Sequence, residues 1–185
     1  MGAHIFPDLH AIASSLTPAN SHILWRPLWL LNLFDALIKA MIGLLQRVSG
    51  ATVTVAGETV GEIGRGLMVL VAVHRDDNEA DITRLAERIL TYRVFPDAEG
   101  RMNRSLLDER LDLLLVPQFT LAADTKKGTR ASFTKAAPPE TGEEYFERLV
   151  AVCREQLDTV ETGRFGANMQ VSLTNDGPVT FWLET

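Results

Sequence analysis

Short segments in which apolar and β-branched residues recur at alternate positions dominate the chain from residue 41 onward. This period of two is typical of β-strands that bury one face. Glycines at 57, 61, 64 and 66 punctuate the first segments in the manner of hairpins, which favours an antiparallel N-terminal ribbon. The pattern predicts strands at residues 42–48, 51–55, 67–73, 111–116, 169–173 and 179–183.

Two stretches replace this alternation with apolar residues three and four positions apart, the spacing of an amphipathic helix. The first stretch contains Ile82, Leu85, Ala86, Ile89 and Leu90, and the second contains Tyr145, Phe146, Leu149, Val150 and Cys153. We interpret Asp76 and Asp77 as caps of the first helix, while Pro138 and Pro139 can begin the second helix but not continue it. Because strands and helices do not alternate regularly, we expect an α+β fold with two main helices and a largely antiparallel or mixed sheet.

Residues 1–40 differ in composition from the rest of the chain. They hold three of the four histidines and two of the three tryptophans, but only four charged residues. The apolar run from residue 23 to 38 is interrupted by Arg26, Pro27, Asn32 and Asp35 and is shorter than the roughly 18 residues of a membrane span. We predict an N-terminal extension at 1–40, poorly ordered or partly helical, and a single catalytic domain at 41–185. The extension is either an accessory amphipathic segment or sequence upstream of the true start at Met41, and we favour the second reading.

Composition narrows the classes of function. The net charge of −6 argues against a protein that coats nucleic acid by neutralising phosphates, although a local basic patch remains compatible. The single cysteine, Cys153, cannot form an internal disulfide and favours a reducing compartment, so we expect a cytoplasmic protein. Motifs of serine hydrolases, zinc proteases and P-loop enzymes are missing, and we expect no metal and no cofactor. We interpret His74, at a strand end beside Arg75, as a solvated loop residue rather than a catalytic base.

Candidate chemistry concentrates between residues 116 and 137. A hydrophobic strand delivers Gln118, Phe119 and Thr120 at its end, where polar side chains and backbone amides can face a ligand. The loop that follows carries four cations and an interleaved aromatic ring, a combination that can hold phosphates while a base stacks. These residues are Lys126, Lys127, Arg130, Lys135 and Phe133.

The Gly177-Pro178 step lies where the sequence otherwise indicates a buried strand. Proline fixes φ and donates no hydrogen bond, so a strand that contains it either ends there or is locally reshaped. A trans bond in a turn made of Asn175, Asp176 and Gly177 is the ordinary interpretation. A cis bond in a shaped strand is the alternative.

Two motifs, PQFTL at 117–121 and NDGPVT at 175–180, resemble the signatures of the D-aminoacyl-tRNA deacylase family. The segments MIGLLQRVSGATVTV, YRVFPDAEGRMN and GANMQVSLTNDGPVTFWL also match, so the resemblance covers residues 41–185. It implies a barrel-like sheet and a homodimer with its active site at the interface. The implied reaction is hydrolysis of the ester that joins a D-amino acid, or a wrongly attached glycine, to the 3′ end of tRNA, with rejection of L-amino acids.

The resemblance also implies roles for individual residues. Gln118, Phe119 and Thr120 would line the pocket, and a cis Gly177-Pro178 bond would enter the pocket of the partner subunit. Arg47 and Asn175 would support that element. Phe165 and Met169 would contact the terminal adenine, although both also fit a place in the core. The resemblance further implies that the tRNA 2′-hydroxyl takes part in catalysis. In the sequence itself, no histidine, lysine or terminal amine is evidently placed to activate Thr120 as a nucleophile.

Alternatives and departures from the family pattern remain. Two alternative functions stay open. The chain could form a non-catalytic nucleic-acid or protein-binding dimer of the same fold, or it could be a threonine esterase that acts on small molecules. Pro117 stands where the family usually has serine, which puts in doubt any binding role of that position. Ala131 and Ala136 replace residues that are commonly proline and glycine, and we expect these changes to alter loop geometry more than chemistry.

Overall fold

A long antiparallel pair organises the sheet. The computed structural model describes residues 41–126 and 128–185, so the predicted extension at 1–40 and Lys127 lie outside the described residues. Strand β1 (Ile42–Val55) pairs along its length with β8 (Met169–Glu184). The other edge of β1 pairs antiparallel with β3 (Gly66–Ala72) and, further along, with β2 (Glu58–Ile63).

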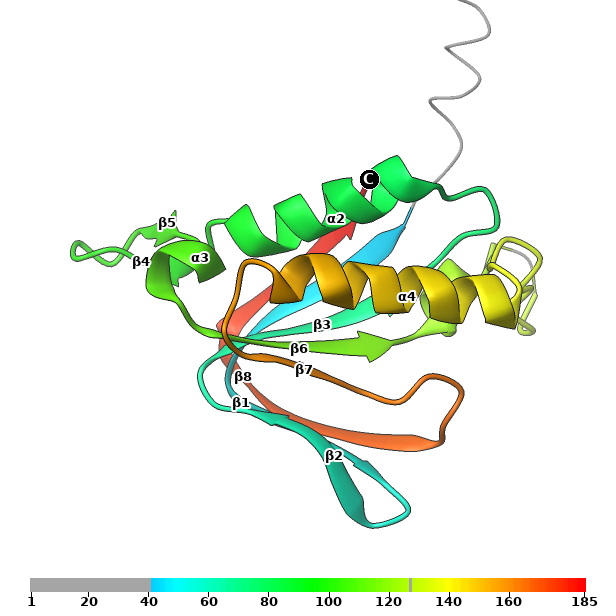
Figure 1. The fold of residues 1–185 in the computed structure, drawn as a ribbon, viewed down its shortest axis with the longest axis horizontal. Coiled ribbons are helices and arrows are strands. Elements are labelled where there is room, and N and C mark those ends of the chain that lie inside the picture. The colour runs from blue at the N-terminus through cyan, green and yellow to red at the C-terminus, as the bar shows by residue number, and fades with distance from the viewer. Residues whose placement is uncertain (1–40, 127) are drawn as a thin grey trace, which may run out of the picture. The chain divides into compact units, whose positions relative to one another are not determined.

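Two parallel strands extend the sheet beyond β3. Strand β6 (Asp112–Pro117) pairs with β3, and the short strand β7 (Val160–Thr162) pairs with β6. The sheet curls until β2 approaches β7 (Figure 1), where a Cβ on Gly61 would lie 2.6 Å from the carbonyl oxygen of Thr162. The expected α+β fold with a mixed, barrel-like sheet is therefore confirmed.

Two long helices, α2 (Glu79–Thr91) and α4 (Pro139–Arg154), lie on the same side of the sheet (Figure 1). Smaller elements connect them to the strands. These are β4 (Phe95–Pro96), β5 (Met102–Arg104), α3 (Leu106–Glu109) and a 3₁₀ turn, η1 (Phe119–Ala122). None of the helices within 41–126 and 128–185 is long and apolar enough to cross a membrane.

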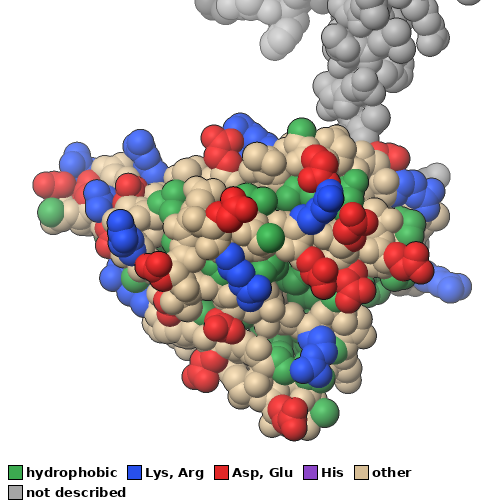
Figure 2. Space-filling model, viewed as in Figure 1, with side chains coloured by type: hydrophobic (Ala, Val, Ile, Leu, Met, Phe, Trp, Pro, Cys, Tyr) green, Lys and Arg blue, Asp and Glu red, His purple; other side chains and the backbone are tan. Residues whose placement is uncertain are grey.

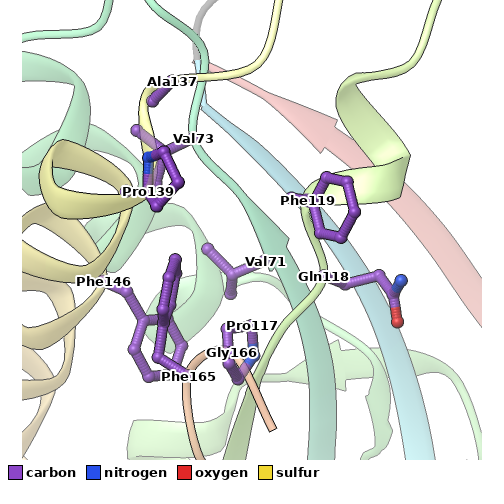
Figure 3. Close-up of a pocket in the computed structure, with 11 residues that line it drawn as sticks. Val71, Val73, Pro117, Gln118, Phe119, Ala137, Pro139, Phe146, Phe165 and Gly166 are labelled. Carbon is purple, nitrogen blue, oxygen red and sulfur yellow. The ribbon is translucent and has the colours of Figure 1, made fainter. Parts of the chain in front are cut away.

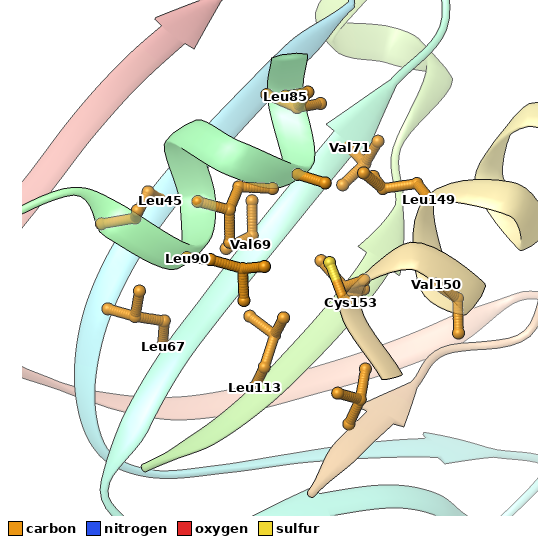
Figure 4. Packing of buried hydrophobic residues seen from close by; sticks show 14 of the residues in the cluster. Leu45, Leu67, Val69, Val71, Leu85, Leu90, Leu113, Leu149, Val150 and Cys153 are labelled. Carbon is orange, nitrogen blue, oxygen red and sulfur yellow. The ribbon is translucent and has the colours of Figure 1, made fainter. Parts of the chain in front are cut away.

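The core lies between these helices and the sheet. Leu85 and Leu90 of α2 and Leu149 of α4 are fully buried against strand residues such as Val69 and Leu113 (Figure 4). Their helical spacing places the apolar side chains on one face, as the sequence pattern indicates. The Cys153 thiol belongs to the same cluster, and burial raises its pKa to about 12.

The structure corrects two details of the predicted elements. Helix α2 is capped by Asn78, whose side chain accepts a hydrogen bond from the amide of Ala80 at 2.9 Å, and not by Asp76 or Asp77. The side chain of Asp81 completes a capping box with the Asn78 amide at 2.9 Å. Four of the six predicted segments also merge in pairs, since 42–48 and 51–55 belong to β1 and 169–173 and 179–183 belong to β8.

Candidate functional site

The end of β6 places the first part of the PQFTL motif. The amide of Gln118 donates a hydrogen bond of 2.7 Å to the carbonyl of Val71, which extends the β3–β6 pairing by one residue. The chain then turns into η1, so Phe119 and Thr120 leave the sheet and are exposed. The side-chain amide of Gln118 donates a hydrogen bond to the Thr120 hydroxyl. This geometry brings the three predicted residues together at one edge of the sheet.

A pocket of about 240 Å³ opens beside this turn, between the end of β6 and helix α4. In Figure 3, Phe146 and Phe165 lie on one side of the pocket and Gln118 and Phe119 lie on the other. The pocket is lined by Val71, Val73, Pro117, Gln118, Phe119, Ala137, Pro139, Gly142, Phe146, Phe165 and Gly166. Among the residues that the structure describes, none in this lining has an ionisable side chain, and Gln118 supplies the one polar side chain.

Phe165 and Met169, which were both predicted to contact the terminal adenine, lie in different parts of the structure. Phe165 lines the pocket and packs on α4 where Gly142 lacks a side chain, since a Cβ there would lie 3.3 Å from Cζ of Phe165. Met169 is absent from the lining and is half-buried against the second core cluster. Its sulfur accepts a hydrogen bond of 3.3 Å from the Arg164 amide. The structure therefore brings Phe165, but not Met169, to the pocket.

The loop after η1 is closed on itself by backbone pairing between Asp124 and Ser132. The Asp124 carboxylate accepts from the Lys126 amide at 3.0 Å and faces the Lys135 ammonium at 3.5 Å. The amide hydrogen bond, aided by the nearby lysines, lowers the pKa of Asp124. Lys126 and Lys135 both line one pocket beside this loop.

An aromatic pair joins the basic loop to the pocket. The Phe133 ring lies 5.1 Å from the Phe119 ring, and both side chains are exposed. Lys126, Arg130 and Lys135 are exposed nearby in the sequence, whereas Lys127 is outside the described residues. The predicted aromatic and basic residues thus follow directly on the strand end that lines the pocket.

Gly177 and Pro178 form a bulge in β8 and are both exposed. Asn175 pairs with Val48 and Thr180 pairs with Gln46, so the four residues from Asp176 to Val179 oppose the single residue Arg47. The Gly177-Pro178 bond is cis, as the resemblance implies. Neither residue lines the pocket of the same chain.

Side chains on both strands hold this bulge in place. Asn175 Oδ1 accepts from the Val179 amide at 2.7 Å, and Asn175 Nδ2 donates to the Thr180 hydroxyl at 2.9 Å. The Arg47 guanidinium donates to the carbonyl oxygens of Asp176 at 2.9 Å and Val94 at 2.6 Å. Gly177 has φ of +137°, and a Cβ there would lie 2.7 Å from Cγ2 of Val179. The bulge therefore has a defined conformation that suits glycine.

His74 is not the solvated loop residue that the sequence suggested, because it is 5% exposed. Its amide donates a 2.6 Å hydrogen bond to the carboxylate of Asp77, which is also buried. Burial raises the pKa of Asp77 to about 7, with smaller contributions from the charges of Asp81 and Asp76, against the lowering effect of the His74 amide. His74 and Thr120 line a separate pocket of about 320 Å³ together with Lys126 and Lys135.

Sequence reasoning missed most of the apolar walls of the pocket. Val71, Val73, Gly142 and Phe146 come from β3, the segment after it and α4, and each also fits a core position in its own element. Pro139 was predicted only as a helix start. The one available signal was Pro117, which the motif placed next to Gln118 and which does line the pocket.

Comparison with known proteins supports the motif assignment. The sequence model described as D-Tyr-tRNA(Tyr) deacylase matches residues 44–184. The D-aminoacyl-tRNA deacylase of Alkalilimnicola ehrlichii is 64% identical over 144 residues, covering 78% of this chain and 96% of that protein. The protein of the same name from Escherichia coli O1:K1 is 55% identical and is covered to 99%.

Two solved structures share the fold. A c-Myc DNA unwinding element binding protein superposes with a TM-score of 0.75 at 37% identity, over 78% of this chain and 98% of that one. A probable eukaryotic D-amino acid tRNA deacylase superposes with a TM-score of 0.70 at 19% identity, over 78% and 99% of the two chains, and supports the fold alone. From its sequence matches, the chain belongs to the D-aminoacyl-tRNA deacylase family and is a hydrolase that acts on ester bonds.

Proposed function

We propose that this protein edits aminoacyl-tRNA in the cytoplasm by hydrolysing the ester of a D-amino acid, or of misattached glycine, at the tRNA 3′ end while sparing L-aminoacyl esters. Family membership supports the reaction class. The apolar pocket supports the kind of ligand. Its size and its flat aromatic walls, Phe146 and Phe165, suit the base of the terminal adenosine, with the ester near Gln118.

The observation that carries the catalytic proposal is that the described residues lining the pocket include no acid and no base. Ester hydrolysis needs a proton acceptor for the attacking group, and none of the lining side chains supplies one. The 2′-hydroxyl of the terminal ribose is adjacent to the ester and enters with the substrate. In this proposal the protein holds that ribose in a reactive orientation, and backbone amides at the turn into η1 support the developing oxyanion.

Selectivity against L-amino acids is assigned to Gly177 and Pro178 of a partner subunit. The bulge is exposed, held by Arg47 and Asn175, and separate from the pocket of its own chain, which are the properties of an element that serves a second copy. A backbone wall on one side of Cα admits hydrogen or a D side chain turned away from it. An L side chain on the wall side would collide with it. Rejection then needs no recognition of the D side chain.

The deciding experiment compares deacylation of D-tyrosyl-, L-tyrosyl- and glycyl-tRNA by the purified protein. We expect rapid hydrolysis of the D and glycyl esters and retention of the L ester. Equal rates of deacylation for the D and L esters would contradict the role of Gly177 and Pro178 in rejecting L-amino acids. Binding of tRNA without hydrolysis of any ester would instead favour the non-catalytic dimer of the same fold.

Subunit mixing tests the shared site. Phe119→Ala damages the pocket and Gly177→Ala distorts the bulge, so each homodimer is expected to be impaired. Mixed dimers would contain one site with an intact pocket and an intact bulge, and activity should return when the two variants are mixed. No recovery, despite subunit exchange shown by native mass spectrometry, would place both elements in the same chain's site.

A nucleophilic role of Thr120 is the second candidate, and it rests on one observation. Thr120 and buried His74 line the same pocket, so an imidazole is present on that side of the turn. Against it, the Thr120 hydroxyl accepts a hydrogen bond from Gln118, which adds no basic group to it. The two mechanisms make opposite predictions for removal of the Thr120 hydroxyl.

A further inference from the structure

A second and larger pocket adjoins the first one. It measures about 490 Å³ and lies between one face of α4 and the connection from β7 to β8. The two pockets share the side chains of Phe146 and Phe165 as a common wall. A chain of nucleotides whose last base occupies the first pocket can therefore continue into the second pocket, because only the side chains of Phe146 and Phe165 separate the two.

The second pocket differs from the first in carrying charges of both signs. Glu143, Glu147 and Arg154 follow each other at intervals of four and seven residues, so they line one face of α4. Arg164 faces this row from the β7–β8 connection. Figure 2 shows acidic, basic and hydrophobic side chains together over this side of the molecule.

Three of these charged groups are available to a ligand. Among residues 41–126 and 128–185, no described side chain or backbone group pairs with the carboxylates of Glu143 and Glu147 or with the Arg164 guanidinium. The Arg154 guanidinium is engaged, because it donates to the Val160 carbonyl at 3.2 Å. The pocket thus offers unpaired acceptors from the helix and an unpaired donor from the opposite wall.

This arrangement suits a ligand edge that both donates and accepts hydrogen bonds. A phosphate is a poor match, since two carboxylates line the same space. The Watson–Crick edge of cytosine fits, because its amino group donates to a carboxylate while its ring nitrogen and carbonyl accept from a guanidinium. Uracil reverses the first contact by presenting a carbonyl oxygen to the carboxylate.

We propose that this pocket binds the cytidine that precedes the terminal adenosine, with Glu143 and Glu147 accepting from its amino group and Arg164 donating to its carbonyl side. The inference rests on the proposed function, since all mature tRNAs end in CCA. The pocket that contains Lys126 and Lys135 is a less direct place for this cytidine, because none of its described lining residues also lines the first pocket, where the terminal adenine is proposed to bind. Binding of the penultimate base would position the 3′ end of the tRNA so that its ester lies near Gln118.

The test uses D-tyrosyl minihelix RNAs that end in CCA or in CUA, with kcat/KM as the readout. For the wild-type protein we expect the CCA substrate to be hydrolysed about tenfold faster. The double variant Glu143→Ala/Glu147→Ala, and separately Arg164→Ala, should reduce this preference to less than about twofold.

The matched control is Glu140→Ala/Glu144→Ala. These exposed residues lie on the same helix but outside the pocket, so the variant loses the same charge and should keep the full preference for CCA. Equal hydrolysis of CCA and CUA by the wild-type protein would overturn the cytidine site while leaving the deacylase function intact. A preference that survives both pocket variants would also overturn it. Hydrolysis of neither RNA, when full-length D-tyrosyl-tRNA is also untouched, would overturn the proposed function and this inference with it.

Discussion

The Nε of Arg47 donates a hydrogen bond of 2.9 Å to the carbonyl oxygen of Asp176, and the same nitrogen lies 3.2 Å from the Asp176 carboxylate. The second branch of the guanidinium reaches the carbonyl of Val94. One side chain on β1 therefore ties the bulge in β8 to the segment that precedes β4. Its planar fork can hold two carbonyls at once, which a lysine ammonium cannot do with the same geometry.

Replacement of Arg47 by alanine should destabilise the protein and loosen the bulge. The Arg47 side chain is 12% exposed, so two carbonyls lose a charged donor in a largely buried place. We expect the free energy of unfolding, measured in urea, to fall by about 2 kcal/mol. Arg47→Lys should recover only part of this loss. The control Arg84→Ala removes an exposed helix pair with Glu87 and should cost less than about 0.5 kcal/mol. Equal losses at the two sites would contradict the bridging role.

Removal of the Thr120 hydroxyl separates the two catalytic candidates. If the tRNA 2′-hydroxyl takes part in the reaction, Thr120→Ala loses only a neutral hydrogen bond, and kcat should fall by less than about tenfold. A substrate with a 2′-deoxy terminal adenosine should then react about a hundredfold more slowly or worse. Single-turnover rates for both changes give the answer. Loss of all activity in Thr120→Ala, with normal hydrolysis of the deoxy substrate, would instead establish a threonine nucleophile.

Local patterns were enough to predict most of the framework. Alternation identified β1, β3, β6 and β8, and helical spacing identified α2 and α4. Strand β2 was missed because the large apolar residues of its sequence ETVGEI, Val60 and Ile63, are three positions apart, so they do not alternate. Strand β7 has three residues and exists through parallel pairing with β6, which no local pattern encodes. Short strands of this kind depend on neighbours that are distant in the sequence.

The sequence predicted the motifs of the site, but it did not predict which residues form the walls of the pocket. The residues PQFTL and NDGPVT carried the resemblance, and Gln118, Phe119 and Thr120 do lie together. The pocket walls join Val71 of β3 to Phe165 after β7, a separation that only the folded sheet closes. His74 was misjudged for the same reason, because its neighbours Arg75 and Asp76 are exposed while the buried Asp77 carboxylate holds its backbone.

Gly66→Ala should prevent stable folding. A Cβ at Gly66 of β3 would overlap the carbonyl oxygen of Asp112 and lie 2.8 Å from its carbonyl carbon, and both of these atoms belong to the backbone of the paired strand β6. Backbone cannot move aside as a side chain can, so we expect a loss of about 3 kcal/mol or more, seen as insoluble protein or a large drop in the urea midpoint. Gly64→Ala is the control, since its Cβ would lie 3.6 Å from an Asp112 side-chain oxygen. Wild-type stability in Gly66→Ala would contradict the packing of these strands.

Asp77 should make stability depend on pH between about 4 and 7. Burial raises the pKa of this carboxyl from its ordinary value of 3.8 to about 7, and its Oδ1 has no hydrogen-bond partner among the described residues. The folded protein therefore holds a proton that the unfolded chain releases, so the contribution of Asp77 to stability is highest below pH 4, declines as pH rises to 7 and changes little above that.

Asp77→Asn tests this dependence because its amide stays neutral and its oxygen can still accept from the His74 amide. We expect the stability of Asp77→Asn relative to wild type to rise steadily from pH 4 to 7 and to be flat outside that window, as measured by urea unfolding at each pH. Asp76→Asn removes an exposed carboxylate from the same loop and should show a much weaker trend. A difference between Asp77→Asn and wild type that does not vary with pH would mean that Asp77 is ionised in the folded protein.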